Sequence, residues 1–433
     1  MSESKKFFIK TFGCQMNVYD SMRIAAMLRA RGMVMADKIP DADIIILNTC
    51  AVRAKATDKV YSELGRIRLI KKPDALMGIV GCVARESGAD AFKRVPDINF
   101  VLGPQSYHKL PDILDNPDAK LLNVDLSGLE KFDALPQMTV SPTVAYIPVQ
   151  EGCNHCCTYC IVPYTRGREV SRNAADIMAE VENAAATGAV EICFLGQNVN
   201  GYKQDGKNAL SHLIRETAKI DAIKRIRFTS SYPTEMTDDL IEMFGTEAKL
   251  LPFLNMPIQS GSPDVLRRMN RPYSLDLYLG IIDKLRAVRP DVQISSDFIV
   301  GFPGETDADF AQTVEIAKRV GYINSYSFKY SPRPHTAAAL MPDQIPENIK
   351  KTRLAELDST LGELQRRFNE SCVDKTLSCL LEGRDKTGRH LLYRTPYMQQ
   401  CIVTTDIAPE NAPKIATIKI TAANKASLRG EFA

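Results

Sequence analysis

Long apolar segments are missing from this chain of 433 residues. Its longest apolar stretch, ALMGIVGCVA at 75–84, falls well short of the roughly 20 residues that span a bilayer as a helix. Residues 1–14 also lack the apolar core and the small-residue cleavage site of a secretory signal peptide. We therefore expect a cytoplasmic protein that makes no membrane contact.

A strong charge of either sign is absent as well. The formal net charge is +3 and the isoelectric point is about 8.2, which is too mild to establish a nucleic-acid partner. Residues 373–433 contain nine Lys or Arg against six Asp or Glu, so residues 1–372 sum to zero. With 45% hydrophobic residues the chain is globular, and its length predicts two or three domains.

Cysteine is present at unusual local density. Four of the eleven cysteines fall within EGCNHCCTYC at 151–160. Thiols stay reduced in the cytosol, so this clustering favours metal or redox chemistry over disulfides. Structural zinc is disfavoured because a second C-x2-C pair is missing, whereas three thiolates on a short loop suit an iron–sulfur cubane with one open iron. Spacing leaves open which three of the four bind, and Cys156 is the candidate bystander.

Residues 1–130 alternate apolar strand-like runs with helical patterns. Runs at 6–14, 42–50, 76–82 and 99–104, with a helix over 20–31, predict a doubly wound parallel sheet. Three of these runs end on a cysteine, at Cys14, Cys50 and Cys82. Parallel strands place their carboxyl ends along one edge, so we expect these thiols to meet there, although each alone could be a small buried hydrophobe.

Residues 127–142 are expected to form a linker, and residues 139–372 then repeat the strand–helix alternation. Six runs predict a partial (β/α)6 barrel with function at the carboxyl ends of its strands: 143–150, 190–197, 225–231, 253–259, 293–301 and 325–331. Helices are predicted at 174–187 and 276–288, and a charged helix at 347–371. In residues 373–433, four runs predict a small β-barrel: 376–383, 389–395, 399–406 and 414–421.

Together these features resemble a known family. C-x3-C-x2-C with Tyr159 before its last cysteine, just after the first strand of a six-strand series, is similar to radical S-adenosylmethionine enzymes. Over residues 6 to about 340 the chain resembles their methylthiotransferases, and CQMN resembles the MiaB branch, which acts on tRNA. The segments that carry this resemblance are TFGCQMN (11–17), NTCAVR (48–53), VGCVARE (80–86), GCNHCCTYCIVPYTRGRE (152–169), LGQNVNGY (195–202), MPIQSGS (256–262) and SDFIVGFPGET (296–306).

The resemblance implies two [4Fe-4S] clusters and S-adenosylmethionine as cofactors. The radical-generating cluster would be held by Cys153, Cys157 and Cys160, and an auxiliary cluster by Cys14, Cys50 and Cys82. The candidate S-adenosylmethionine contacts are Gln197, Gln259 and Asp297, with Tyr159 against the adenine. The alternative for each of these polar residues is loop capping. No side chain is assigned a catalytic role, because the chemistry belongs to the cofactors.

The implied reaction is methylthiolation of C2 of N6-isopentenyladenosine at position 37, beside the anticodon of tRNA. A 5'-deoxyadenosyl radical would abstract hydrogen, and the auxiliary cluster would donate sulfur. The expected partners are tRNA and an electron donor such as flavodoxin or ferredoxin, and the enzyme is expected to be a monomer. Residues 373–433 would be a TRAM-like RNA-binding domain, given their size, basic excess and closing SLRGE, although GRHLLYRTPYMQQCIV in their middle fits the pattern poorly.

Two alternatives stay open. A methylthiotransferase of the same chemistry could act on threonylcarbamoyladenosine in tRNA or on a ribosomal-protein aspartate. A more distant alternative is a non-catalytic iron–sulfur protein that binds RNA.

A few residues fall outside these assignments. The stretch from Arg53 to Lys72 carries seven bases beside Cys50 and either contacts phosphates or forms a solvated helix face. His155 is expected to be a solvated loop residue, and His335 stands where the family has glycine. The remaining cysteines are expected to be structural: Cys193, Cys372, Cys379 and Cys401.

Overall fold

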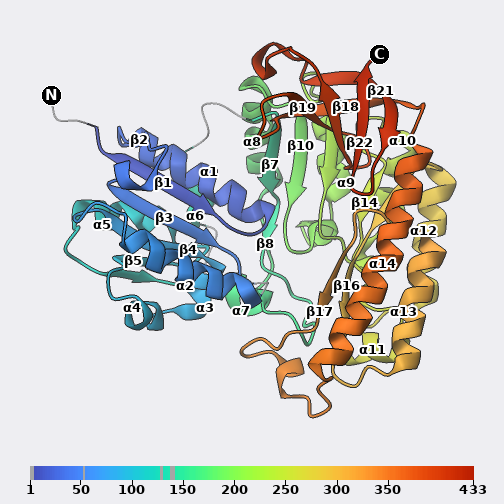
Figure 1. Cartoon of the computed structure of the whole chain (residues 1–433), viewed down its shortest axis with the longest axis horizontal. Coiled ribbons are helices and arrows are strands. Elements are labelled where there is room, and N and C mark those ends of the chain that lie inside the picture. The colour runs from blue at the N-terminus through green and yellow to red at the C-terminus, as the bar shows by residue number, and fades with distance from the viewer. Residues whose placement is uncertain (1–3, 52–53, 127–129, 137–141) are drawn as a thin grey trace.

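The computed structural model describes residues 4–51, 54–126, 130–136 and 142–433. Figure 1 shows a first domain beside a larger central unit, with the C-terminal strands packed on one end of that unit. Within the described ranges no helix is both long and apolar enough to cross a membrane.

The first domain is built on a six-stranded parallel sheet of order β2-β1-β3-β4-β5-β6. Its strands are β1 (Lys6–Thr11), β2 (Val34–Met35), β3 (Ile44–Thr49), β4 (Leu76–Gly81), β5 (Phe100–Leu102) and β6 (Leu121–Asn123). The parallel sheet and its four predicted strands are confirmed. The edge strands β2 and β6 were missed because two or three residues are too few to show a periodic pattern.

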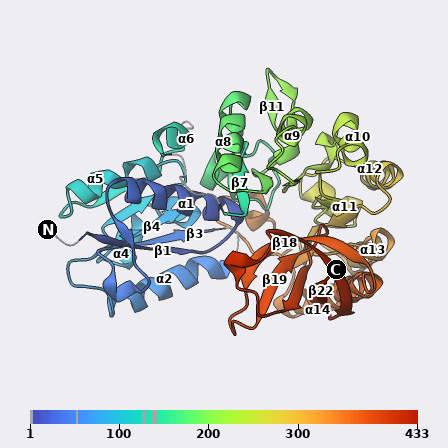
Figure 2. The ribbon, with the colours of Figure 1, turned by 90° about the horizontal axis from the view of Figure 1, so that it is seen from above.

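Helices cover both faces of this sheet, as a doubly wound fold requires (Figure 2). One face carries α1 (Gln15–Ala30) and α5 (Leu110–Asp115), and the other carries α2 (Ala54–Arg68), α3 (Cys82–Ser87) and α4 (Asp90–Arg94). Alternate residues of β3 serve the two faces: Ile44 and Ile46 pack beneath α1, while Ile45 and Leu47 pack beneath α2. The strand is therefore buried throughout and apolar over its first four residues, the pattern of a parallel strand buried on both sides.

The expected linker contains a buried element. Residues 127–129 and 137–141, half of the stretch assigned as linker, lie outside the described residues, but α6 (Glu130–Ala134) lies between them. Arg23 of α1 donates to the carbonyls of Phe132, at 3.1 Å, and Leu135, at 2.6 Å, and Lys131 is only 1% exposed. The sequence analysis missed this anchor because a five-residue helix is too short to show a repeated pattern.

The central unit is an open barrel of parallel strands, which confirms the predicted partial barrel. Its strands are β7 (Val144–Pro148), β10 (Glu191–Leu195), β13 (Arg225–Phe228), β14 (Phe253–Asn255), β15 (Gln293–Ser295), β16 (Asp297–Val300) and β17 (Tyr326–Lys329). The hydrogen-bonded groups are β13-β10-β7, β14-β15 and β16-β17, and a parallel bridge between Ile226 and Leu250 joins the first two. The predicted strand 293–301 is interrupted at Ser296, so β15 and β16 pair with different neighbours.

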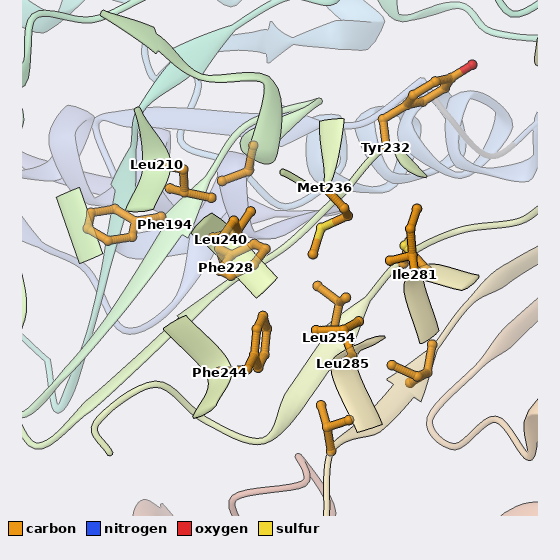
Figure 3. Close-up of a cluster of buried hydrophobic side chains, with 14 of the residues drawn as sticks. Phe194, Leu210, Phe228, Tyr232, Met236, Leu240, Phe244, Leu254, Ile281 and Leu285 are labelled. Atoms are coloured by element: carbon orange, nitrogen blue, oxygen red, sulfur yellow. The ribbon is translucent and has the colours of Figure 1, made fainter. Parts of the chain in front are cut away.

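Outer helices bury apolar side chains against these strands (Figure 3). These helices are α8 (Ala174–Ala186), α9 (Leu210–Ala218), α10 (Asp238–Thr246), α11 (Pro263–Arg268), α12 (Leu275–Val288) and α13 (Asp307–Val320), and a short hairpin, β11 (Lys203–Gln204) and β12 (Lys207–Asn208), precedes α9. Phe194 and Phe228 from the strands meet Leu240 and Phe244 from α10. The apolar core therefore lies between the strands and the outer helices. The cysteine loop lies at the carboxyl ends of the strands.

A long helix, α14 (Glu347–Ser371), matches the predicted charged helix and leads to a closed barrel. The barrel strands, in order β18-β19-β20-β22-β21, are β18 (Thr376–Arg384), β19 (His390–Arg394), β20 (Gln400–Thr404), β21 (Ile415–Ala423) and β22 (Ser427–Phe432). The predicted small barrel is confirmed, with β22 as an additional strand. The four cysteines expected to be structural are all fully buried: Cys193 in β10, and Cys372, Cys379 and Cys401 in or beside the C-terminal barrel.

The C-terminal barrel docks on the amino ends of the central strands. Arg225, the first residue of β13, is 4% exposed and donates to the carbonyls of Ser378, Arg394 and Thr395 at 3.1–3.2 Å. Lys414 reaches the carbonyl of Gly188, just before β10, at 2.6 Å. Because the central strands are parallel, this barrel lies at the opposite end from their carboxyl termini.

Candidate active site

Three cysteines follow three adjacent strands of the first sheet. Cys14 is the N-cap of α1 after β1, Cys50 directly follows β3, and Cys82 begins α3 directly after β4. The order β1-β3-β4 therefore places them side by side at the carboxyl edge of the sheet. We call Cys14, Cys50 and Cys82 the strand-end set.

Two glycines let the turns of the strand-end set approach one another. A β-carbon on Gly13, whose φ is +128°, would lie 2.4 Å from the β-carbon of Cys50. A β-carbon on Gly81, whose φ is +91°, would lie 2.7 Å from the carbonyl oxygen of Thr49. Both positions combine a positive φ with a close contact, so glycine is required for the three turns to meet.

The strand-end thiols differ in acidity. A hydrogen bond from the Cys50 thiol lowers the pKa of Cys14 to about 6, and the positive charge of Arg166 acts in the same direction. Burial raises the pKa of Cys82, although Arg166 opposes that rise. Cys14 is exposed, whereas Cys50 and Cys82 are buried. The set therefore has one accessible, acidic thiol and two enclosed ones.

The second group of cysteines lies on the loop between β8 (Gln150–Glu151) and α7 (Val162–Arg166), and β9 (Val170–Ser171) pairs with β8. We call Cys153, Cys157 and Cys160 the loop set. Backbone bonds fix the loop: the Cys160 amide donates to the Cys157 carbonyl at 3.0 Å, and the Thr158 amide to the Met269 carbonyl at 3.0 Å. Burial raises the pKa of Cys153 and of Cys160 to about 12.

Neither set has the arrangement of ligands around a single ion. Among the described residues, no three His, Cys, Asp or Glu side chains converge in that way. Three thiols on three separate turns, or spread along one loop, suit a larger group in which each thiolate binds a different iron of a cubane. The donor chemistry therefore fits iron–sulfur clusters, since thiolates are their usual protein ligands. Cys156 is exposed, and its thiol is 3.6 Å from the Asn154 carbonyl.

Gln197, a candidate S-adenosylmethionine contact, supports the loop set. Its side-chain oxygen accepts a hydrogen bond of 2.6 Å from the Gly152 amide, next to Cys153. Gly152 has φ +75°, and a β-carbon there would lie 2.1 Å from the Arg168 carbonyl oxygen. This bond corresponds to the loop-capping alternative for Gln197, and its contact with S-adenosylmethionine stays a prediction.

Gln259, Asp297 and Tyr159 lie around the same barrel mouth. Gln259 has φ +74°, and its backbone exchanges hydrogen bonds with the Asp297 carbonyl and the Ile299 amide. Asp297 is the first residue of β16 and lies two residues after the end of β15, because the predicted strand is interrupted at Ser296. Tyr159 is half-buried between the loop cysteines, with its ring edge-on to Phe302 at 6.5 Å.

Arg271 is a central residue that the sequence did not reveal. It is 5% exposed, and its guanidinium lies 3.8 Å from the Cys157 sulfur and 3.4 Å from the Tyr159 hydroxyl. It also donates to the Pro257 carbonyl at 2.6 Å and lies over the ring of Tyr232 at 4.7 Å. A buried cation so close to the loop set would stabilise negative charge on a bound cluster. No motif marks an isolated arginine 114 positions away from its sulfur partner.

His155 is not the solvated residue that was expected. Its ring stacks on Tyr232 with centroids 3.6 Å apart, and its Nε2 lies 3.2 Å from a carboxylate oxygen of Glu235. The loop histidine therefore anchors the cysteine loop to the segment after β13. The sequence expectation failed because both partners lie far along the chain.

A buried ionic network joins the two sets. Arg166, the last residue of α7, donates to Glu151 at 3.0 Å, to Asn17 at 3.0 Å and to Asp20 at 3.4 Å. Lys131 bonds both Asp20, at 3.1 Å, and Glu151. The four charged side chains are at most 3% exposed, and their two positive and two negative charges balance. Since Arg166 comes six residues after Cys160 and Asn17 three residues after Cys14, the network couples the cysteine loop to the strand ends.

The basic stretch from Arg53 to Lys72 is largely paired in the part that the structure describes. Arg53 and the Lys55 side chain lie outside the described residues. Arg66 pairs with Glu63, Arg68 with Asp97 at 3.2 Å, and Lys72 with Asp43 at 2.7 Å. These pairs favour the solvated helix face over phosphate contacts.

Comparison with known proteins bears on both halves of this site. Residues 6–103 match the uncharacterized protein family UPF0004, and residues 147–317 match the radical SAM superfamily. The chain is 45% identical over 437 residues to tRNA-2-methylthio-N(6)-dimethylallyladenosine synthase of Cereibacter sphaeroides, covering 100% of this chain and 99% of that protein. It is also 45% identical over 446 residues to the synthase of the same name from Rickettsia conorii, covering 99% and 100%.

A solved structure shares the fold. The radical S-adenosylmethionine methyltransferase TsrM from Kitasatospora setae, with cobalamin and a [4Fe-4S] cluster bound, superposes with a TM-score of 0.55. The sequence identity is 13%, over 78% of this chain and 77% of that chain. At this identity the likeness concerns the fold.

Proposed function

Because the chain belongs to the radical S-adenosylmethionine family of tRNA-2-methylthio-N(6)-dimethylallyladenosine synthases, we propose that it methylthiolates C2 of N6-isopentenyladenosine beside the anticodon of tRNA. The observation that carries the proposal is the pairing of two separate sets of three thiols, bridged by the buried Arg166. One set suits radical generation from S-adenosylmethionine, and the other suits sulfur donation.

The loop set, Cys153, Cys157 and Cys160, would hold the cluster that binds S-adenosylmethionine, and the strand-end set, Cys14, Cys50 and Cys82, would hold a second [4Fe-4S] cluster. When bound, these groups supply the reductive cleavage of S-adenosylmethionine and the sulfur to be transferred. Gln197 holds the loop backbone in place, and Tyr159, Gln259 and Asp297 line the barrel mouth where S-adenosylmethionine would bind.

The chain's own residues supply placement and shielding. Arg271 sets a buried positive charge beside Cys157 and fixes the Tyr159 hydroxyl. The network around Arg166 closes the contact between the two domains with satisfied, buried charges and so excludes water from that junction. The target base would lie where both cysteine sets are within reach.

The domains would divide the work. Residues 1–130 would carry the sulfur donor, residues 139–372 the radical chemistry and residues 373–433 part of the tRNA affinity. The first boundary of the central domain, at 139, lies outside the described residues. The C-terminal barrel exposes basic side chains that can neutralise phosphates: Lys386, Arg389, Lys419, Lys425 and Arg429. A flavodoxin or ferredoxin would supply electrons, and the enzyme would act as a monomer.

Nucleoside analysis of tRNA tests the proposal. A strain that lacks this gene should accumulate N6-isopentenyladenosine and lose its 2-methylthio derivative, and the plasmid-borne wild-type gene should restore the modification. If the tRNA loses instead the methylthio form of threonylcarbamoyladenosine, or mass spectrometry of the ribosomal proteins shows that a methylthio-aspartate is lost, the substrate assignment is wrong. If all methylthio products persist, the enzyme assignment is wrong.

A further inference from the structure

The rim between the two cysteine sets is formed by two short helices in contact. Arg85 lies on α3, three residues after Cys82, and Tyr164 lies on α7, four residues after Cys160. The Arg85 guanidinium donates to the Tyr164 carbonyl at 3.3 Å. The backbone of α7 is therefore held against α3, while the Tyr164 side chain is 46% exposed.

A third segment brings a second aromatic ring to this rim. The exposed His335 ring lies 5.8 Å from the Tyr164 ring, centroid to centroid, at an interplanar angle of 35°. His335 has φ +66°, a left-handed conformation that disfavours residues with a β-carbon. The buried Thr336 anchors the turn, since its hydroxyl donates to the Arg333 carbonyl at 2.8 Å. The turn thus holds a histidine ring outward in a conformation that glycine would adopt more easily.

The rim also carries positive charge. Arg85 is half-exposed, and Arg333, in the same turn as His335, interacts electrostatically with Glu86 and with Cys50. Guanidinium groups therefore lie beside the aromatic pair on the side of the strand-end set. Neither ring belongs to a buried apolar cluster of the described residues, so core packing does not account for the pair.

We propose that Tyr164 and His335 form a stacking platform for an unpaired base next to the modified adenosine, with Arg85 and Arg333 against the RNA backbone. The proposal rests on the proposed function. An adenine that reaches both cysteine sets must lie between them, so its neighbours in the strand must cross this rim. Splayed bases of RNA loops stack on aromatic side chains, and arginine contributes further through its charge and its planar face.

The test compares variants of the reconstituted full-length protein. The probe is a fluorescent RNA hairpin whose unpaired loop contains N6-isopentenyladenosine, and affinity is measured by anisotropy at fixed salt. Tyr164→Ala should weaken binding about 10-fold, because stacking on one base is lost. Tyr164→Phe should bind like the wild type, because the ring remains. His335→Gly removes the second ring while it suits the positive φ, and should weaken binding about 3-fold.

Two controls separate stacking from general damage. Tyr326→Ala removes a tyrosine that is 59% exposed near Asn324, where the central unit contacts the C-terminal barrel, and should bind the hairpin normally. A blunt RNA duplex of equal length offers no splayed base, so Tyr164→Ala and the wild type should bind it equally. An equal loss on hairpin and duplex would overturn the stacking role.

The outcomes also separate this inference from the proposed function. If Tyr164→Ala and His335→Gly bind the hairpin as tightly as a wild type that methylthiolates it, the platform is wrong and the function stands. If the wild type neither binds nor methylthiolates the hairpin, the proposed function fails and the platform with it. Loss of affinity in Tyr164→Ala, retained in Tyr164→Phe, supports the platform.

Discussion

The two cysteine sets are assembled in different ways. The loop set comes from eight consecutive positions, and its shape is fixed by a few backbone hydrogen bonds and by Gln197. The strand-end set comes from three turns spread over residues 14–82, and it exists only because β1, β3 and β4 are neighbours in the sheet. One site is thus specified locally, and the other depends on the fold of a whole domain.

The sets also differ in electrostatics. Cys14 is an exposed thiol with a lowered pKa, whereas burial raises the pKa of Cys153 and of Cys160. Arg166 lies beside the strand-end set, where it bonds Asn17, and Arg271 lies beside Cys157 of the loop set. Each site therefore has its own buried cation, while the network around Arg166 joins the sites.

Removal of the loop set should have the largest effect. Reconstituted wild type should hold about eight irons per chain, and Cys153→Ala/Cys157→Ala/Cys160→Ala about four. This variant should release no 5'-deoxyadenosine under reducing conditions, since the site for S-adenosylmethionine is lost. Cys156→Ala, in the same loop, is the matched control and should keep all its iron. Unchanged iron in the triple variant would contradict the two-site assignment.

Removal of the strand-end set should abolish product but spare radical chemistry. Cys14→Ala/Cys50→Ala/Cys82→Ala should also hold about four irons and still cleave S-adenosylmethionine, yet form no methylthio product on isopentenylated tRNA. A purely packing role predicts a loss of stability of about 1 kcal/mol for each buried cysteine, without any change in iron. Iron analysis, thermal unfolding and both product assays decide between the two roles. Normal methylthiolation by the folded variant would exclude sulfur donation from this set.

The different pKa values of the cysteine thiols should give different rates of alkylation. In protein stripped of iron, a pKa of about 6 makes Cys14 roughly nine-tenths thiolate at pH 7, and its reaction with iodoacetamide should fall as the pH drops below 6. At pH 7 Cys153 and Cys160, with pKa values of about 12, are thiolate to only about one part in 10⁵. Mass-spectrometric peptide mapping across pH 5–9 measures both rates. Similar alkylation rates for Cys14 and for Cys153 and Cys160 would show that the two sets do not differ in acidity.

Breaking the junction should have the smallest of these effects. Arg166→Ala leaves Asp20 and Glu151 with one buried cation instead of two, and should lower the free energy of unfolding of the iron-free protein by about 3–5 kcal/mol. Arg166→Lys keeps the positive charge but loses the several N–H donors of the guanidinium group. It should therefore lower the free energy of unfolding by less than Arg166→Ala does. Arg68→Ala, which breaks an exposed pair with Asp97, should cost no more than about 1 kcal/mol. Urea unfolding measures all three, and equal costs for Arg166→Ala and Arg68→Ala would show that the network adds nothing.

Local patterns were sufficient for much of the architecture. The strands β1, β3 and β4 each contain an apolar run, at 7–9, 44–47 and 76–80, and a cysteine follows each strand. The charged helix expected at roughly 347–371 is confirmed as α14, whose 25 residues are long enough to show a helical pattern in the sequence. Elements of two to five residues, such as β2, β6 and α6, were missed because they are too short for a pattern to repeat.

The amino-acid sequence alone was enough to predict which cysteines lie together. The spacing of Cys153, Cys157 and Cys160 is a property of one short loop, and the positions of Cys14, Cys50 and Cys82 at strand ends follow from the parallel sheet. Both sets are therefore encoded by residues close in sequence or by a regular fold, which a pattern can express.

The charged side chains that surround the thiols could be identified only from the three-dimensional fold. Arg166 meets Asn17 across 149 positions, Arg271 meets Cys157 across 114, and Arg225 meets the C-terminal barrel across 153 or more. In a sequence, an isolated arginine is expected to lie at the surface. Folding buries it together with its partner, and because both groups then lose their water, they must pair with each other. That pairing fixes the distance between the two cysteine sets, and no periodicity along the chain records it.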